Sequence, residues 1–66
     1  MSELLFYSKE HKNYIYLKQE VYDKDLKEKG IVKYIYNDKS VKVMFKNTKK
    51  FYFPNDFVNK IELIKN

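Results

Sequence analysis

Few residues of this chain could carry chemistry. His11 is the only histidine, and the 66 residues include no cysteine. A metal such as zinc needs several nitrogen or sulfur ligands, so a lone histidine predicts an exposed polar residue in a turn. Asp23, Asp25 and Glu28 form an acidic cluster, but lysines occupy positions 24, 27 and 29. This interleaving predicts a solvated loop rather than an acid–base pair or a magnesium site.

Nucleophilic and phosphate-binding motifs are also missing from the sequence. No serine, threonine or lysine stands in a recognisable nucleophile motif, and a chain with one glycine has no glycine-rich phosphate loop. We therefore expect a protein that is not an enzyme and that uses neither a cofactor nor a metal.

Aromatic and basic side chains indicate binding instead. The chain has seven tyrosines and five phenylalanines, and all fourteen basic residues are lysine, against nine acidic ones, for a net charge of +5. A positive surface favours polyanions such as nucleic acid, although a genome of low GC content explains the lysine bias equally well. Lysine lacks the bidentate fork with which arginine reads guanine, so we expect weak sequence specificity.

The elements that must position these residues are mainly strands. Runs at 31–36 and 40–46 alternate with a period near two around Asn37 and Asp38, which predicts a hairpin with a two-residue turn. In the second run the lysines cannot be buried cheaply, so the residues between them must face the core, namely Val41, Val43 and Phe45.

The same turn sets the expected face of each residue in the first run. It puts Val32 and Tyr34 on the core side and leaves Ile31, Ile35 and Met44 outside or half covered. A bulge near Lys33 is the device that would bring Ile35 back inward.

The stretch from Lys50 to Phe53 predicts a further strand, with Phe51 and Phe53 facing the core and Tyr52 facing outward. Pro54 has no N–H for a ladder and must end this strand. Residues 54–57 then suit one helical turn with Phe57 inward, and residues 60–64 suit a short closing strand.

Two segments precede Gly30. Residues 19–22 predict a strand that enters a charged loop at 23–29. The first eighteen residues fit a hairpin of 4–7 with 14–17, because 14–17 alternates and is rich in strand formers. The alternative is a helix, since Leu4, Tyr7, His11 and Tyr14 lie at helical spacing.

Several of these stretches together resemble a known architecture. Val21-Tyr22, Gly30-Ile31-Val32, Val41-x-Val43-x-Phe45 and Phe51-x-Phe53-Pro54-x-x-Phe57 are similar to the small SH3-like or Tudor-like barrels of CarD-type transcription regulators and UvrD-type helicase C-termini. The last stretch looks like a variant with a KxFxYPxxF signature. The loop before Gly30 departs from such modules, which usually carry a histidine and glycines there.

The resemblance implies a strongly bent five-stranded sheet that contacts nucleic acid or a protein such as RNA polymerase, without catalysis. We expect a mostly β fold, an SH3-like antiparallel barrel of about five strands at 19–66, preceded by a strand pair or extension at 1–18. No stretch approaches the ~20 apolar residues of a membrane span, and the first residues lack a signal-peptide pattern, so we expect a cytoplasmic protein.

The leading functional hypothesis is nucleic-acid binding through a basic sheet face that bears tyrosines. The residues expected on this face are Lys33, Tyr34, Tyr36, Lys42, Lys46, Lys49, Lys50 and Tyr52. One alternative is a stand-alone adaptor or inhibitor of a larger protein, encoded by a phage or mobile element. A homodimer formed through the apolar residues of 4–17 is another.

Overall fold

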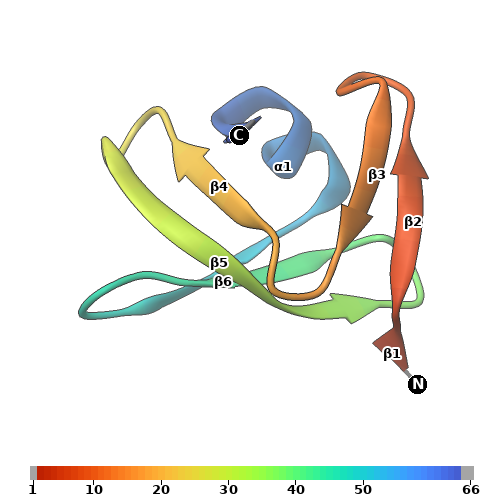
Figure 1. Cartoon of the computed structure of the whole chain (residues 1–66), viewed down its shortest axis with the longest axis horizontal. Helices are drawn as coiled ribbons and strands as arrows, with labels where there is room; N and C mark the ends of the chain where they lie inside the picture. Colours follow the sequence, from red (N-terminus) through yellow and green to blue (C-terminus); the bar gives the residue numbers. More distant parts are fainter. Residues whose placement is uncertain (1, 65–66) are drawn as a thin grey trace.

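The structure is a computed structural model that describes residues 2–64, so Met1 and the end of the expected 19–66 unit, Lys65 and Asn66, lie outside the described residues. The fold is mostly β, as predicted, with one short helix (Figure 1). In chain order its elements are β1 (Ser2–Glu3), β2 (Leu5–Ser8), β3 (Asn13–Tyr16), β4 (Glu20–Asp23), β5 (Glu28–Tyr36), β6 (Val41–Met44), β7 (Lys49–Tyr52), α1 (Pro54–Lys60) and β8 (Ile61–Leu63).

The main sheet is antiparallel and follows the order β7-β6-β5-β4-β8, while β1 pairs with the far end of β5. The ladders formed within residues 2–64 leave this sheet open, because none of them joins β7 to β8. The expected closed barrel is therefore not found. Helix α1 lies on the concave side of the curved sheet, between β4 and the β2–β3 hairpin (Figure 1).

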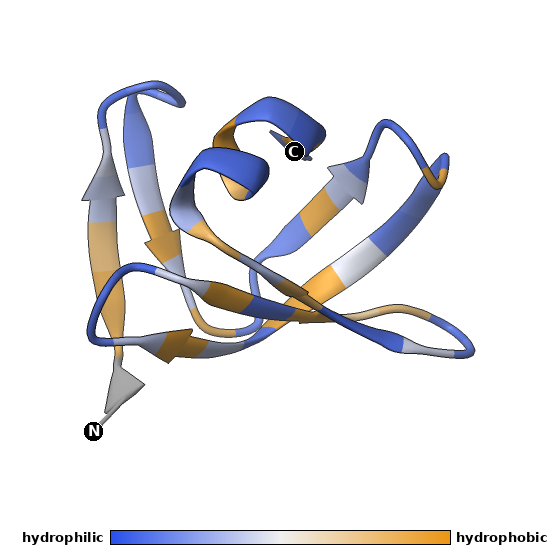
Figure 2. Ribbon diagram, turned by 180° about the vertical axis from the view of Figure 1, so that it is seen from behind, coloured by the Kyte–Doolittle hydropathy of each residue, from blue (hydrophilic) through white to orange (hydrophobic). Residues whose placement is uncertain are grey.

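The core lies between the sheet, α1 and the hairpin, and it consists of aliphatic and aromatic side chains. Its buried members are Ile15, Val21, Val32, Ile35, Val41, Val43, Phe45, Tyr52, Phe57 and Ile61. Hydropathy follows this division, because apolar segments lie on the strands while the β2–β3 and β5–β6 turns are hydrophilic (Figure 2). The predicted inward positions of Val41, Val43 and Phe45 are confirmed.

A bulge in β5 decides which residues face outward. The register shifts between Val32 and Tyr34, so Lys33 is the extra residue. Val32 and Ile35 are both buried, and Ile31 is 47% exposed. The bulge and the inward turn of Ile35 are thus confirmed, but the inward placement of Tyr34 was wrong, because the bulge moves it to the outer face.

Strand β7 has the opposite orientation to the one predicted. Tyr52 is 1% exposed, whereas Phe51 and Phe53 are 44% and 60% exposed. The register explains this, because Tyr52 pairs with the buried Val41 and Phe51 pairs with Lys42. Side chains of paired residues share a face, so β7 buries its tyrosine and exposes its phenylalanines. Phe57 is buried as predicted.

Gly30 is required by close packing rather than by its backbone conformation. It pairs with Val21 on β4. A Cβ atom at this position would lie 2.6 Å from Val43 Cγ1 and 2.8 Å from the ring of Phe45. The two core side chains therefore lie directly over the bare backbone of the glycine.

The turns place lysine where glycine is usual. Lys12, Lys18, Lys27 and Lys39 have φ angles of 56°, 70°, 59° and 70°. Lys39 ends the β5–β6 turn, in which Tyr36 N donates to Ser40 O, so the turn contains three residues rather than the two predicted. The left-handed region is unfavourable for residues that carry a Cβ.

Residues 5–8 and 13–16 form the predicted strand pair, one residue away from the expected bounds, and β2 and β3 make a separate two-stranded sheet. The hairpin is attached to the rest of the chain through His11, whose Nε2 donates to the carbonyl of Ile61 at 2.7 Å. The His11 ring also lies 5.3 Å from that of Phe57. His11 thus lies in a turn, as predicted, but it is a half-buried structural link rather than an exposed residue. Between residues 2 and 64, no helix is long and apolar enough to cross a bilayer.

Candidate functional site

Four exposed or half-buried rings lie in a row across the outer face of β5, β6 and β7. We call them the aromatic strip, and its members are Tyr34, Tyr36, Phe51 and Phe53. Centroid separations along the strip are 4.6 Å from Tyr34 to Tyr36, 5.3 Å from Tyr36 to Phe51, and 5.0 Å from Phe51 to Phe53. The last two contacts are edge-to-face. Tyr34, Phe51 and Phe53 remain 38%, 44% and 60% exposed, so part of each ring is open to a ligand.

A lysine lies within this strip. Lys42 of β6 pairs with Tyr34 on one side and with Phe51 on the other, so it shares their face. Lys49 lies on the same face, because it pairs with Met44, two residues beyond Lys42. A cation between rings is the arrangement that lets a surface hold a phosphate and a stacked base together.

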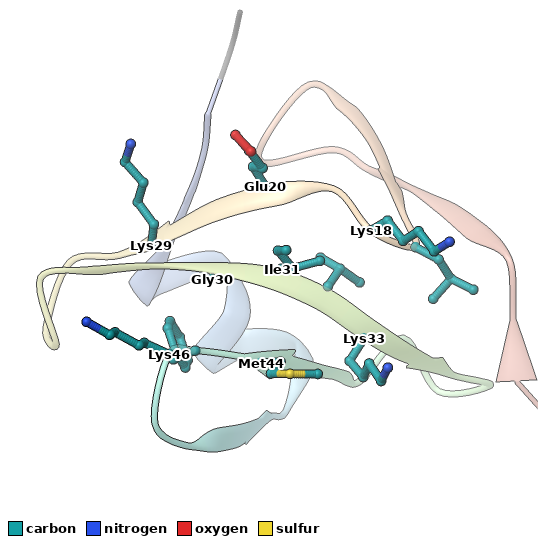
Figure 3. Close-up of a pocket in the computed structure, with 11 residues that line it drawn as sticks. Lys18, Glu20, Lys29, Gly30, Ile31, Lys33, Met44 and Lys46 are labelled. Atoms are coloured by element: carbon teal, nitrogen blue, oxygen red, sulfur yellow. The ribbon is translucent and has the colours of Figure 1, made fainter.

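An apolar groove adjoins the strip on the outer side of β5 and β6. It has a volume of about 780 Å³ and contains Ile31 and Met44. Figure 3 shows Lys29 and Lys46 at one end of the groove and Lys18 and Lys33 at the other, with Glu20 on its upper rim. Four ammonium groups beside one carboxylate extend the positive surface from the strip across β5.

Two of the predicted site residues lie on the opposite side of the sheet. Tyr52 is buried, and its hydroxyl donates to the carboxylate of Asp23. Lys50 Nζ lies 3.9 Å from Asp23 Oδ2 and 5.3 Å from the centroid of the Tyr52 ring. Both residues therefore support the core, and their expected place on the outer face was wrong.

Asp23 is the centre of this buried polar cluster. Its Oδ1 also accepts hydrogen bonds from the backbone N–H groups of Asp25 at 2.7 Å and Leu26 at 3.0 Å. Burial raises the pKa of the Asp23 carboxyl, but the hydrogen bonds from Tyr52, Leu26 and Asp25 and the Lys50 charge outweigh it, so the pKa is lowered. Burial and this carboxylate raise the pKa of Tyr52 well above its usual range.

The predicted set is thus divided. The outer face brings together Tyr34, Tyr36 and Lys42, with Lys49 in the next row and Lys33 and Lys46 at the groove. Phe51 and Phe53 were missed because both were assigned to the core. The pairing of β6 with β7 could have indicated their exposure, because in this register Phe51 shares the face of Lys42.

The described part of the chain offers no constellation for metal binding. Within residues 2–64, no group of three or more histidine, cysteine, aspartate or glutamate side chains is placed to hold a metal ion. Comparison with models of known protein families, with curated proteins and with solved structures found no match.

Proposed function

We propose that this chain is a non-catalytic module that binds single-stranded nucleic acid through the aromatic strip. The observation that supports this function is the strip itself, with Lys42 in register between Tyr34 and Phe51. Exposed rings stack on unpaired bases of any sequence, at about 1–3 kcal/mol per base. Lysines beside them neutralise the flanking phosphates.

Single strands suit this surface better than duplexes. The bases of a duplex are stacked on one another and present only their edges in the grooves, whereas unpaired bases can be splayed out onto rings. The bent antiparallel sheet with a short helix before its last strand is consistent with the SH3-like resemblance, and we propose that architecture as the origin of the curved binding face.

The test is a binding titration with fluorescently labelled twelve-nucleotide probes of DNA and RNA, compared with a duplex of the same length, at 20 mM and 200 mM salt. We expect Kd values below about 100 μM for the single strands at low salt, weaker binding at high salt, and weaker binding of the duplex. Absence of binding below that concentration, or equal affinity for the duplex, would contradict the proposal.

A matched pair of variants assigns the binding to the strip. Phe51→Ser removes a strip ring that is 44% exposed, and Tyr14→Ser removes a ring that is 52% exposed on the separate β2–β3 sheet. Only the first substitution should weaken binding. If both variants bind equally well, the contact surface lies elsewhere on the chain.

A further inference from the structure

The outward side of the β2–β3 hairpin carries a second set of exposed apolar residues. Leu5 pairs with Tyr16 and Tyr7 pairs with Tyr14, so the four side chains share one face. Their exposed fractions are 51% for Leu5, 49% for Tyr7, 52% for Tyr14 and 48% for Tyr16. We call these four residues the tyrosine face.

The tyrosine face is supported from behind by the core. The intervening residues of the hairpin, Phe6, Ser8 and Ile15, turn inward, and Ile15 is fully buried. The rings of Tyr7 and Tyr14 meet edge-to-face at 5.2 Å. The face is therefore a preorganised apolar surface, which lowers the entropy lost when a partner covers it.

Charge distinguishes this face from the aromatic strip. None of the four side chains is charged, and the charged residues of the hairpin turn are Lys9, Glu10 and Lys12. A polyanion would find no cation among the four residues. Two copies of the chain, each with a net charge of +5, repel one another. The electrostatic cost of their approach is smallest where neither copy presents a charge.

We propose that a second copy of this chain covers the tyrosine face and forms a two-fold symmetric dimer. An isologous interface requires one patch to be complementary to itself. The tyrosine face meets this requirement, because its two cross-strand pairs place rings and an aliphatic side chain side by side, and aromatic rings pack well edge-to-face against one another.

The available area predicts a weak dimer. A completely buried aromatic side chain contributes about 150–250 Å², so half-exposed ones offer about 100 Å² each. The four residues of the tyrosine face therefore offer about 400 Å² in each copy, or about 800 Å² over both partners, which is below the about 1,000 Å² of a specific, stable interface. We therefore expect monomer and dimer to exchange as the concentration changes.

Salt separates this association from nucleic-acid binding. Screening weakens the attraction between lysines and phosphates, but it also weakens the repulsion between two positive copies. The dimer should therefore become more stable as salt rises from 20 mM to 500 mM, which is the opposite of the trend expected for nucleic acid.

The test is sedimentation equilibrium between 10 μM and 1 mM protein. We expect the average mass to rise from the monomer value of 8.2 kDa toward twice that value. Tyr7→Ser with Tyr14→Ser should remain monomeric, whereas Tyr34→Ser with Phe51→Ser should associate like the unsubstituted chain. Tyr16→Lys places a charge on an exposed position of the face and should also prevent association while the fold is retained.

Three results from sedimentation would overturn the proposal. They are a constant mass of 8.2 kDa up to 1 mM, undiminished association of the Tyr7→Ser, Tyr14→Ser variant, and association that weakens as salt rises. Intermolecular contacts between labelled and unlabelled copies, observed by isotope-filtered NMR, should join the rings of the tyrosine face. Contacts that instead involve the aromatic strip would equally count against it.

Discussion

The hydroxyl of Tyr52 donates a hydrogen bond to the buried carboxylate of Asp23, and this bond joins β7 to the end of β4 across 29 residues of sequence. Asp23 is fully buried, so its charge depends on the donors around it. The pair explains why β7 turns a tyrosine toward the core and leaves two phenylalanines in solvent.

Removing only the hydroxyl should therefore destabilise the fold. Tyr52→Phe leaves the ring in place but removes a donor to a buried charge, and we expect a loss of about 1.5–3 kcal/mol in the free energy of unfolding. Urea denaturation measures this loss. Tyr36→Phe is the control, because that hydroxyl belongs to a ring on the outer face, and it should change stability by less than about 0.5 kcal/mol.

The two faces of β7 should also differ when whole side chains are removed. Tyr52→Ala creates a cavity in the core and should cost about 3–5 kcal/mol. Phe53→Ala removes a ring that is 60% exposed and should cost less than about 1 kcal/mol. Thermal denaturation of the two variants ranks them directly, and a larger loss for Phe53→Ala would contradict the observed orientation of the strand.

Stability should depend on pH at both ends of the range. The folded state lowers the pKa of Asp23 below its ordinary value of 3.8, so the stability it contributes is present above about pH 4 and is lost as the pH falls through the lowered pKa. The folded state raises the pKa of Tyr52 above its ordinary value of 10.0, so that contribution is present below about pH 10 and is lost above it.

Melting temperatures measured from pH 2 to pH 12 test both limits. Asp23→Asn should reduce the acid dependence, and Tyr52→Phe should reduce the alkaline dependence. Because Asp23 and Tyr52 contribute to each other's pKa shift, each substitution should also weaken part of the other dependence. An acid limit that is unchanged in Asp23→Asn would assign the acid sensitivity to other carboxylates.

Gly30 should not tolerate even one added methyl group. Because the new Cβ would lie 2.6 Å from Val43 Cγ1, Gly30→Ala should destabilise the chain by about 1–3 kcal/mol through overpacking. Val43→Ala in the same chain removes the atom nearest to that methyl group, Val43 Cγ1, although the Phe45 ring at 2.8 Å remains. Urea denaturation of both single variants and the double variant should therefore show a loss smaller than the sum of the two single losses.

Lysines on the two sides of the sheet should affect nucleic-acid binding differently. Lys42→Ala removes one phosphate contact on the outer face, and we expect the slope of log K against log salt to fall by about 0.7 for a single strand. Lys50→Ala removes the same charge from the side that faces Asp23 and should leave the slope unchanged. Equal effects of the two substitutions would indicate that net charge alone governs binding.

The alternation of apolar and polar residues predicted most of the strands. A strand with one buried face must place its apolar residues on that face and its lysines on the other. The alternation located the β5–β6 hairpin, the bulge at Lys33 and the strand pair at the N-terminus. It failed in β7. Burying the two phenylalanines and burying the tyrosine give the same period of two, and hydrophobicity favoured the phenylalanines. The deciding contact comes from Asp23, which is distant in sequence, so no local pattern reveals it.

The candidate surface could be predicted only in part for the same reason. Tyr34 and Lys42 were both expected on the binding face, and their pairing places both on the outer face, although Tyr34 had also been expected to face the core. Phe51 and Phe53 entered the surface only through the register of β7 with β6. Register depends on long-range packing, and a shift of one residue reverses the face of every side chain.

The lysines in the turns affect both the thermal stability of the chain and its positive charge. Lys12, Lys18, Lys27 and Lys39 hold left-handed conformations that cost about 1–2 kcal/mol for residues other than glycine. Replacing any of them with glycine would relieve strain and remove a positive charge in the same step. A lineage of this protein that adapts to higher temperature through its turns would thereby lose electrostatic attraction for polyanions, so the two properties cannot be improved independently at these four positions.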